Sequence, residues 1–284
     1  MRVRRTVQRH VLLVVIGLGG VVGAACGSSD ERASGGGLDA GASDADAAHA
    51  PDAPADSELD AADVGADAPA DVPAPPCPPE MAPVGGTCID RFEAPGVEGG
   101  LPLVMYTFDE SEAWCQQRGK RLCFDDEWTM ACAGDSMTAY PYGVTHQPGV
   151  CNDDEQWRLY NQSLLSGWPA KASSPAIESL EELLAVASSV SASTKQSADH
   201  VEWLYQAEPS GHNAGCTAGN GVFDLTGNVE EWTRRRDGGE PSFHGSLKGR
   251  YWAETRTCQN GIKTHGDGFR FYEIGFRCCR EVSE

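Results

Sequence analysis

The pattern of apolar and polar positions divides the chain into three stretches of different character. Residues 11–22 are almost all apolar and follow a basic segment, but twelve residues are too few to cross a bilayer comfortably. Residues 27–76 consist almost entirely of Ala, Asp, Gly, Pro and Ser, without an aromatic side chain. All seven tryptophans follow residue 77, so we place the folded part at 77–284, which is long enough for one domain with a core.

Two short helices are predicted near the start of the folded part. Thr107 and Glu110 have the spacing of a capping box, in which each side chain accepts a hydrogen bond from the other residue's backbone, and this predicts a helix over 108–118. Consecutive acidic residues favour a second helix over 125–133, because negative charge stabilises a helix N-terminus.

Residues 157–205 differ in pattern from their surroundings and are predicted to be an insertion. Apolar positions recur at helical spacing over 175–186, and Pro175 suits the first turn of a helix, so one helix is expected there. Serine-rich sequence follows that helix. Beyond residue 215, frequent glycines between short apolar runs predict short strands joined by irregular loops.

Residues 1–26 have the layout of a bacterial lipoprotein signal. Arginines precede the apolar run, small residues follow it, and Cys26 stands where lipidation would make it the mature N-terminus. The layout departs from the usual one at Gly23, where such signals carry Leu, and the alternative is a secretory signal cleaved near Ala25. Both interpretations take the chain out of the cytoplasm, either lipid-anchored in the bacterial cell envelope, with the outer membrane favoured, or secreted.

The segment 27–76 is predicted to be a disordered tether between the lipid anchor and the folded domain. It carries twelve acidic residues against one basic residue and buries too little apolar surface to offset the entropy of ordering. The whole chain has a formal net charge of -20. Such an acidic protein repels phosphate, so we expect no nucleic-acid partner and a membrane contact made only through the lipid.

The cysteines predict a set of disulfides in the folded part. The chain has eleven cysteines, and an even number of ten is left after Cys26 is set aside. An even number in an exported domain is typical of a fully oxidised set, and the lack of any C-x-x-C pair argues against a zinc ribbon or a thioredoxin-like redox site. Spacing alone does not give the connectivity. The ten are Cys77, Cys88, Cys115, Cys123, Cys132, Cys151, Cys216, Cys258, Cys278 and Cys279.

Several motifs along the folded part occur in the order of one protein family. They are GKRL at 119–122 followed by EW at 127–128, GVFDLTGNVEEW at 221–232, GS at 245–246 and GFRC at 275–278. Together they resemble the sulfatase-modifying-factor family, which includes the formylglycine-generating enzymes and their relatives in ergothioneine and pyoverdine biosynthesis. The segment 88–93 resembles the opening strand of that family. The resemblance implies a single compact α+β domain, distantly like C-type lectins, with little regular secondary structure.

The resemblance also implies a calcium ion. Asp224 and Glu231 would supply side-chain oxygens, and Gly227 and Val229 would supply backbone carbonyls, which are the ligands calcium prefers. Asp224 replaces the Asn usual in the family and is still an oxygen ligand. A second calcium site in the family begins at the position of Asn152, and its later ligands would fall in the insertion, where they cannot be placed.

The segment 224–231 also allows an interpretation without calcium. It would then be a turn in which Glu231 caps the backbone or pairs with Arg234 or Arg235. The oxygen-ligand spacing favours calcium.

Two disulfides are implied by the resemblance, namely Cys115–Cys278 and Cys132–Cys258. For the other six cysteines our own pairing is Cys77–Cys88, Cys151–Cys216 and Cys123–Cys279. Adjacent Cys278 and Cys279 would point to opposite faces of a strand, so an exchange of their partners is the alternative.

The copper chemistry of the formylglycine-generating enzymes is not expected here. Those enzymes bind copper through a pair of cysteines between the Gly-Ser motif and the cysteine that matches Cys258, since Cu(I) prefers thiolates. The span 247–257 contains no cysteine, and counting back from Cys258 places Lys248 and Ala253 at the two catalytic positions.

Iron remains an open alternative. The ergothioneine branch holds non-haem iron with an H-x-x-x-H pair in a separate helical region, which this chain lacks, and isolated histidines are more often surface or hydrogen-bonded residues. An iron site would need three of the five histidines in the folded part to converge. These are His146, His200, His212, His244 and His265.

A ligand groove is predicted where the family has its catalytic span. Lys248, Arg250, Tyr251 and Trp252 would line it and bind acidic or aromatic groups by charge-assisted bonds and stacking. The alternative is that Tyr251 or Trp252 belongs to the core. We therefore predict an envelope lipoprotein whose domain is non-catalytic and binds a peptide, protein or glycan. The alternative function is a non-haem iron or other oxidoreductase with displaced metal ligands.

Overall fold

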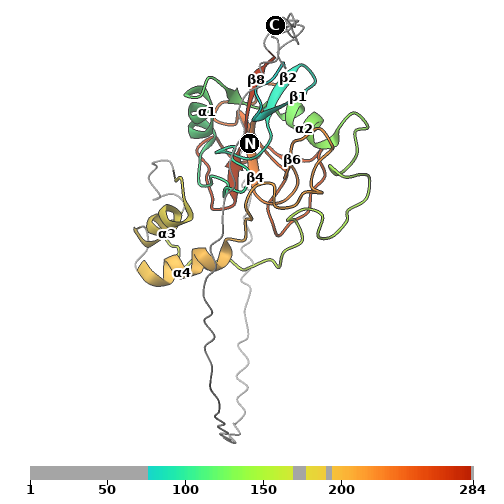
Figure 1. The fold of residues 1–284 in the computed structure, drawn as a ribbon. Coiled ribbons are helices and arrows are strands. Elements are labelled where there is room, and N and C mark those ends of the chain that lie inside the picture. Colours follow the sequence, from blue (N-terminus) through green and yellow to red (C-terminus); the bar gives the residue numbers. More distant parts are fainter. Residues whose placement is uncertain (1–75, 169–176, 190–193, 283–284) are drawn as a thin grey trace, which may run out of the picture. The chain divides into compact units, whose positions relative to one another are not determined.

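The computed structural model describes residues 76–168, 177–189 and 194–282 (Figure 1). The predicted signal with Cys26 and the predicted tether up to residue 75 lie outside these ranges. Within them, no helix has both the length and the apolar composition needed to span a bilayer.

The first of two four-stranded sheets joins the two ends of the folded part. It consists of β1 (Met81–Val84), β2 (Thr87–Asp90), β8 (Cys278–Glu281) and β3 (Arg121–Leu122), in the order β1-β2-β8-β3, with antiparallel neighbours. β8 therefore lies between β2 and β3, and Figure 1 shows β8 beside β2.

The second sheet carries the signature segment into the core. It has the order β6-β5-β4-β7, formed by β6 (Gly261–Ile262), β5 (Gly245–Lys248), β4 (Glu230–Arg234) and β7 (Ile274–Phe276). β4 pairs with β5 antiparallel and with β7 parallel. The end of the 221–232 motif thus becomes a central strand.

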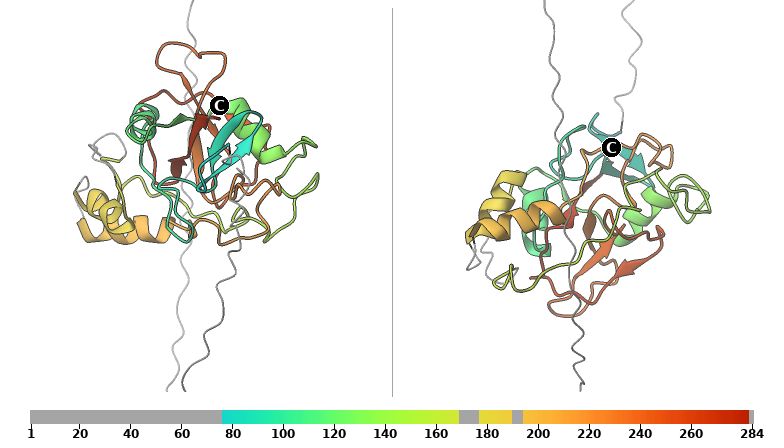
Figure 2. Two further views of the ribbon diagram at one scale, coloured as in Figure 1. Left: turned by 45° about the horizontal axis from the view of Figure 1, so that its top comes forward. Right: turned by 90° about the horizontal axis from the view of Figure 1, so that it is seen from below.

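The two predicted helices are confirmed. α1 (Phe108–Gln116) begins with the expected capping box, in which the Thr107 hydroxyl accepts from the Glu110 N–H at 3.2 Å and the Glu110 carboxylate accepts from the Thr107 N–H at 2.9 Å. α2 (Asp125–Ala133) has the predicted bounds. Both helices can be followed in Figures 1 and 2.

The described part of the insertion contains two helices, whereas one was predicted. α3 (Leu180–Ser189) covers part of the expected 175–186, and α4 (Thr194–Leu204) follows it and packs against it (Figures 1 and 2). α4 is polar except for a narrow stripe that includes Val201 and Leu204, both buried. Its stability depends on tertiary packing, which a serine-rich sequence does not reveal.

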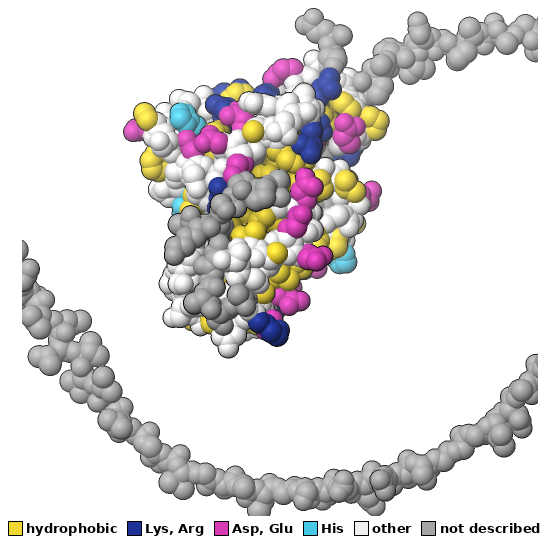
Figure 3. All heavy atoms as spheres, turned by 90° about the vertical axis from the view of Figure 1, so that its left-hand side faces the viewer, with side chains coloured by type: hydrophobic (Ala, Val, Ile, Leu, Met, Phe, Trp, Pro, Cys, Tyr) yellow, Lys and Arg dark blue, Asp and Glu magenta, His cyan; other side chains and the backbone are white. Residues whose placement is uncertain are grey.

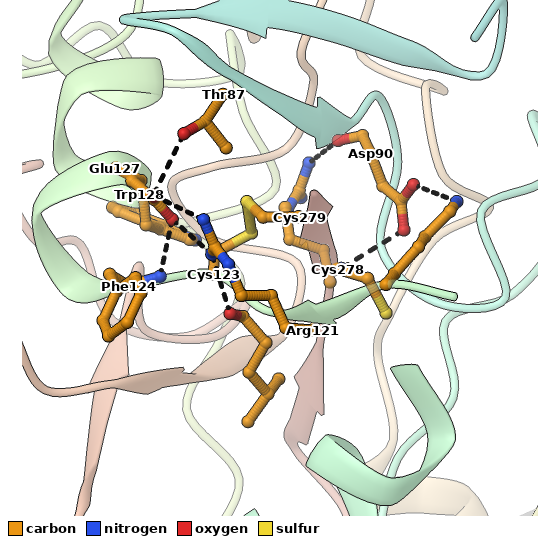
Figure 4. The surroundings of a disulfide bond; sticks show 12 residues. Thr87, Asp90, Arg121, Cys123, Phe124, Glu127, Trp128, Cys278 and Cys279 are labelled. Carbon is orange, nitrogen blue, oxygen red and sulfur yellow. Dashed lines mark hydrogen bonds and ion pairs between the residues drawn. A yellow bond between two sulfur atoms is a disulfide. The ribbon is translucent and has the colours of Figure 1, made fainter. Parts of the chain in front are cut away.

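The described residues form five disulfides, and these confirm the predicted connectivity. The pairs are Cys77–Cys88, Cys115–Cys278, Cys123–Cys279, Cys132–Cys258 and Cys151–Cys216. Figure 4 shows the Cys123–Cys279 bridge beside α2. With mixed helices and sheets and these five bridges, the predicted disulfide-stapled α+β fold is confirmed.

Candidate functional site

The signature segment is fixed in place by a glycine that no other residue can replace without rearrangement. Gly227 has φ +77°, and a Cβ there would lie 2.1 Å from the carbonyl oxygen of Asn152. The next residue, Asn228, donates its N–H to that same oxygen at 2.7 Å, and its side-chain oxygen accepts from the Asn152 amide at 3.1 Å. The structure thus brings Asn152 next to the segment, as part of its backbone packing.

Glu231 lies at the centre of a buried charged cluster. Its carboxylate accepts from Arg277 Nε at 2.8 Å and from Arg277 Nη2 at 2.6 Å, while Trp128 Nε1 donates to it at 2.9 Å. Neither Glu231 nor Arg277 has any exposed side chain. The alternative that Glu231 pairs with an arginine is therefore observed, but the partner comes from a distant segment, after β7, and not from Arg234 or Arg235.

The two carboxylates predicted to bind calcium, those of Asp224 and Glu231, already have hydrogen-bond partners in this structure. Both oxygens of Glu231 are used by Arg277 and Trp128, and one oxygen of Asp224 accepts the N–H of Gly211 at 2.6 Å. Across the described ranges, no group of three or more His, Cys, Asp or Glu side chains is placed to hold a metal ion. Calcium binding stays a prediction, and the function proposed below does not depend on it.

A calcium titration of thermal stability decides whether calcium or Arg277 is the cation of this cluster. Because the structure pairs Glu231 with Arg277, we expect the midpoint of unfolding to stay within about 1 °C up to millimolar calcium, whereas a ligand that binds only the native state would raise stability by an amount that grows with its affinity. A rise of several degrees that is lost in Asp224→Ala would show instead that Glu231 leaves Arg277 to bind calcium.

Two further acids share the cluster around Arg277. Glu93 is fully buried and accepts from Ser210 Oγ at 2.6 Å and from Asn228 Nδ2 at 2.9 Å. Burial raises the pKa of Glu93, and burial together with the charge of Glu93 raises the pKa of Asp224 to about 8. The Arg277 guanidinium thus donates hydrogen bonds to Glu231, and its charge also favours the ionised forms of Glu93 and Asp224. Because these carboxyl groups already share Arg277, the cluster stabilises the fold and does not present Arg277 to a ligand.

The cavity that concerns ligand binding lies between α2, β5 and β6. It has a volume of about 400 Å³. Lys248 and Ser246 from β5 line it together with Asp125 of α2 and with Lys263, and exposed Met130 adds an apolar surface. Of the four residues predicted to line a ligand groove, only Lys248 lines this cavity.

Lys248 has the environment of a buried amine. Its side chain is almost fully buried, Nζ donates to the carbonyl oxygen of Cys258 at 2.9 Å, and Nζ lies 5.3 Å from the centre of the Trp128 ring. Burial lowers the pKa of Lys248 to about 8, while the negative charge of Asp125 opposes this shift and the positive charge of Lys263 adds to it. The amine is therefore mainly charged at pH 7, and its neutral fraction grows as the pH rises toward 9.

Ser246 was not among the predicted site residues. It lies two positions before Lys248 on β5, so both side chains point to the same face of the sheet. Its Oγ is buried and has no hydrogen-bond partner, although the great majority of buried polar groups have one. Strand alternation from the Gly-Ser motif to Lys248 was the signal that could have identified it.

The prediction is wrong for the other three groove residues, which do not line this cavity. Tyr251 and Trp252 are buried in a core cluster with residues of α3 and α4, and Arg250 pairs with Glu230 and Glu254. The reason is that β5 ends at Lys248. Gly249 and Arg250 follow with φ of 81° and 60° and turn the chain away from the cavity.

A second cavity, of about 370 Å³, lies between the 95–104 loop and α3. Its lining is mainly apolar, with Leu101, Val104, Leu180 and Tyr205 among the residues. Figure 3 views the molecule from the side of α1 and α3 and shows hydrophobic side chains lying between acidic ones. No buried polar group without a partner lines this cavity in the described ranges, so it gives no indication of a specific ligand.

The five histidines are engaged at separate places. His146 contacts Asp153 at 3.0 Å, His244 contacts Asp267 at 2.6 Å, and His200 accepts the N–H of Asn161 at 2.9 Å. His212 lies 3.9 Å from Glu208, and His265 stacks on Phe269. The described residues thus give no support to a cluster of displaced iron ligands.

Comparison with known proteins gives a family and several similar folds. A family model described as a sulfatase-modifying factor enzyme 1-like domain matches residues 79–282. PvdO from Pseudomonas aeruginosa is 16% identical with a TM-score of 0.40, covering 69% of this chain and 80% of that chain. CarF is 14% identical with a TM-score of 0.42 (69% and 87% covered), and Treponema denticola variable protein 1 is 12% identical with a TM-score of 0.40 (69% and 84% covered). No curated protein matches the chain.

Proposed function

Because the chain belongs to the sulfatase-modifying factor enzyme 1-like domain family, we propose that it is a non-catalytic member of that family which binds a ligand in the cavity above Lys248 and Ser246. We propose further that it does so in the bacterial cell envelope, as a lipoprotein anchored through Cys26. The ligand would be an acidic group of a peptide, protein or glycan.

One observation carries the proposal. The cavity of about 400 Å³ is lined by a buried hydroxyl without a hydrogen-bond partner and by an amine whose one hydrogen bond in the described structure goes to Cys258. A polar group without a partner in a cavity is costly unless a ligand or an ordered water satisfies it. Ser246 and Lys248 together therefore offer hydrogen-bond donors to an acceptor, and a carboxylate or another anionic group suits both.

The non-catalytic part of the proposal rests on the cysteines. All ten cysteines from Cys77 to Cys279 form disulfides, so no free thiol lies at this cavity. Lys248 stands at a position where the enzymes of the family would have a copper-binding cysteine. The family's copper-thiolate chemistry requires two free thiolates, and this cavity offers an amine and a hydroxyl in their place.

Binding should depend on the charge of Lys248. In the full mature chain, Lys248→Met should weaken binding of an acid-bearing peptide or oligosaccharide about 10- to 100-fold, the size of one charge-assisted hydrogen bond. Affinity should also fall as the pH rises from 7 to 9, because the amine loses its charge near pH 8. Calorimetry with a panel of such ligands, each paired with its neutral amide, measures both effects.

Lys263→Met is the matched control for that measurement. Lys263 lines the same cavity but its side chain is 46% exposed, so its removal should weaken binding at most about fivefold. Equal losses in the two variants would point to general attraction of anions. Oxygen consumption that depends on copper or iron and is lost on mutating domain residues would overturn the non-catalytic proposal.

A further inference from the structure

We propose that Lys248 binds an aldehyde or ketone covalently, as an imine, while the hydroxyl of Ser246 holds the oxygen of the carbonyl group. The inference goes beyond the binding function proposed above, because it uses the neutral form of the amine whose charged form would bind an acidic group. It starts from the fact that an amine, unlike most buried cations, becomes a nucleophile when it loses its proton.

The surroundings of the Lys248 amine favour its neutral form. The side chain is almost fully buried beside the Trp128 ring. Desolvation of this kind activates lysines for imine formation, and it lowers the pKa of Lys248. At the same cavity the negative charge of Asp125 opposes this shift and the positive charge of Lys263 adds to it. The hydrogen bond to the Cys258 carbonyl uses one N–H and leaves the lone pair of the neutral amine available.

Ser246 lies where it can orient the carbonyl group. A Cβ on Gly261 would lie 2.9 Å from Ser246 Oγ and 3.1 Å from Cδ of Lys248, so both side chains pack against the same glycine. A side chain at position 261 would crowd both groups, so glycine there keeps the space beside them free. The unpartnered Ser246 hydroxyl would donate its hydrogen to the carbonyl oxygen and gain the partner that it lacks.

The reaction is balanced without an oxidant or a reductant. The Lys248 nitrogen attacks the carbonyl carbon and forms a C–N bond, and the carbonyl oxygen becomes a hydroxyl by taking a proton. That hydroxyl leaves as water with a second proton as the C=N bond forms, so both protons come from the amine overall.

Reductive trapping tests the imine directly. The full mature protein is incubated with 4-carboxybenzaldehyde and cyanoborohydride, and the labelled lysines are identified by peptide mass mapping. At pH 7.5 we expect Lys248 to be labelled at least about tenfold faster than exposed Lys195. The rate at Lys248 should reach a plateau above pH 8, whereas the rate at Lys195 should continue to rise. Because both lysines are read in one wild-type sample, the result does not depend on a variant that folds.

Two comparisons separate the imine from simple binding. Ser246→Ala should slow the labelling of Lys248 about tenfold and leave Lys195 unchanged. Labelling of Lys248 no faster than Lys195 would overturn the imine. Binding of 4-carboxybenzyl alcohol, which has no carbonyl group, then decides separately on the binding function: loss of that binding in Lys248→Met supports it, and no binding of the alcohol or of any acid in the panel overturns it.

Discussion

Removing both disulfides that tie β8 to the rest of the domain should lower the free energy of unfolding by about 7 kcal/mol, whereas removing either one should cost about 3 kcal/mol. The two bridges are Cys115–Cys278 and Cys123–Cys279. A loss of about 7 kcal/mol is comparable to the whole stability of an ordinary domain, so the variant without both should be largely unfolded at 37 °C.

The difference between one removal and two follows from loop closure. While one bridge is intact, the other closes a loop of only about 10 residues, because the two bridges join neighbouring segments at both ends. When both are absent, the shortest closed path runs through Cys132–Cys258 and spans about 40 residues. The joint loss should therefore exceed the sum of the two single losses by about 1 kcal/mol.

Urea unfolding of the two single-bridge variants and of the variant without both bridges measures these values. Both cysteines of every removed bridge are replaced by Ala, so no free thiol is left. Cys77–Cys88 serves as the control, since it closes a separate 11-residue loop and its removal should add to the others without excess. A joint loss no greater than a single one would contradict the nested arrangement, and mass mapping of the wild type would show whether Cys278 and Cys279 exchange partners.

The sequence allowed the local and covalent features of the fold to be predicted. The capping box at Thr107 and Glu110 and the helix over 125–133 depend on neighbouring residues only, so their signals lie within a few positions. The connectivity of Cys115, Cys132 and their partners came from resemblance to a family, which transfers long-range pairing that spacing cannot give.

The site could be predicted only in part, because its geometry depends on where strands end and on distant partners. Lys248, one of the predicted groove residues, lines the cavity between α2, β5 and β6, but the end of β5 and the turn at Gly249 take Tyr251 and Trp252 into the core. The pairing of Glu231 with Arg277 joins two segments 46 residues apart in sequence through the parallel pairing of β4 and β7. No local sequence pattern predicts such a contact.

Arg277→Met should destabilise the domain by about 3–5 kcal/mol, because it leaves buried carboxylates without their cation. In the wild type the Arg277 guanidinium donates to Glu231 and to the backbone oxygen of Phe223 at 3.0 Å, with no exposed surface. Methionine fills much of the same volume but supplies neither the charge nor the hydrogen bonds. The expected loss follows from unpaired charge more than from packing.

The loss should grow with pH. Burial raises the pKa of Glu93, and the charge of Arg277 opposes that rise, so its removal would raise the pKa of Glu93 further. A carboxyl group whose pKa is raised in the folded state makes that state less stable as the pH rises above the unfolded pKa, because the group ionises first in the unfolded chain. The free energy of unfolding should therefore differ less between variant and wild type at pH 5 than at pH 8.

Arg234→Met is the matched control for the buried arginine. Arg234 forms a partly exposed ion pair with Glu112, so its loss should cost at most about 1 kcal/mol. The double variant Glu231→Gln with Arg277→Met should recover part of the stability, because it removes the uncompensated carboxylate. If Arg277→Met costs no more than the control, the cluster does not need the guanidinium. Stability of that variant restored by millimolar calcium would show that a divalent cation can occupy the place of Arg277 among these carboxylates.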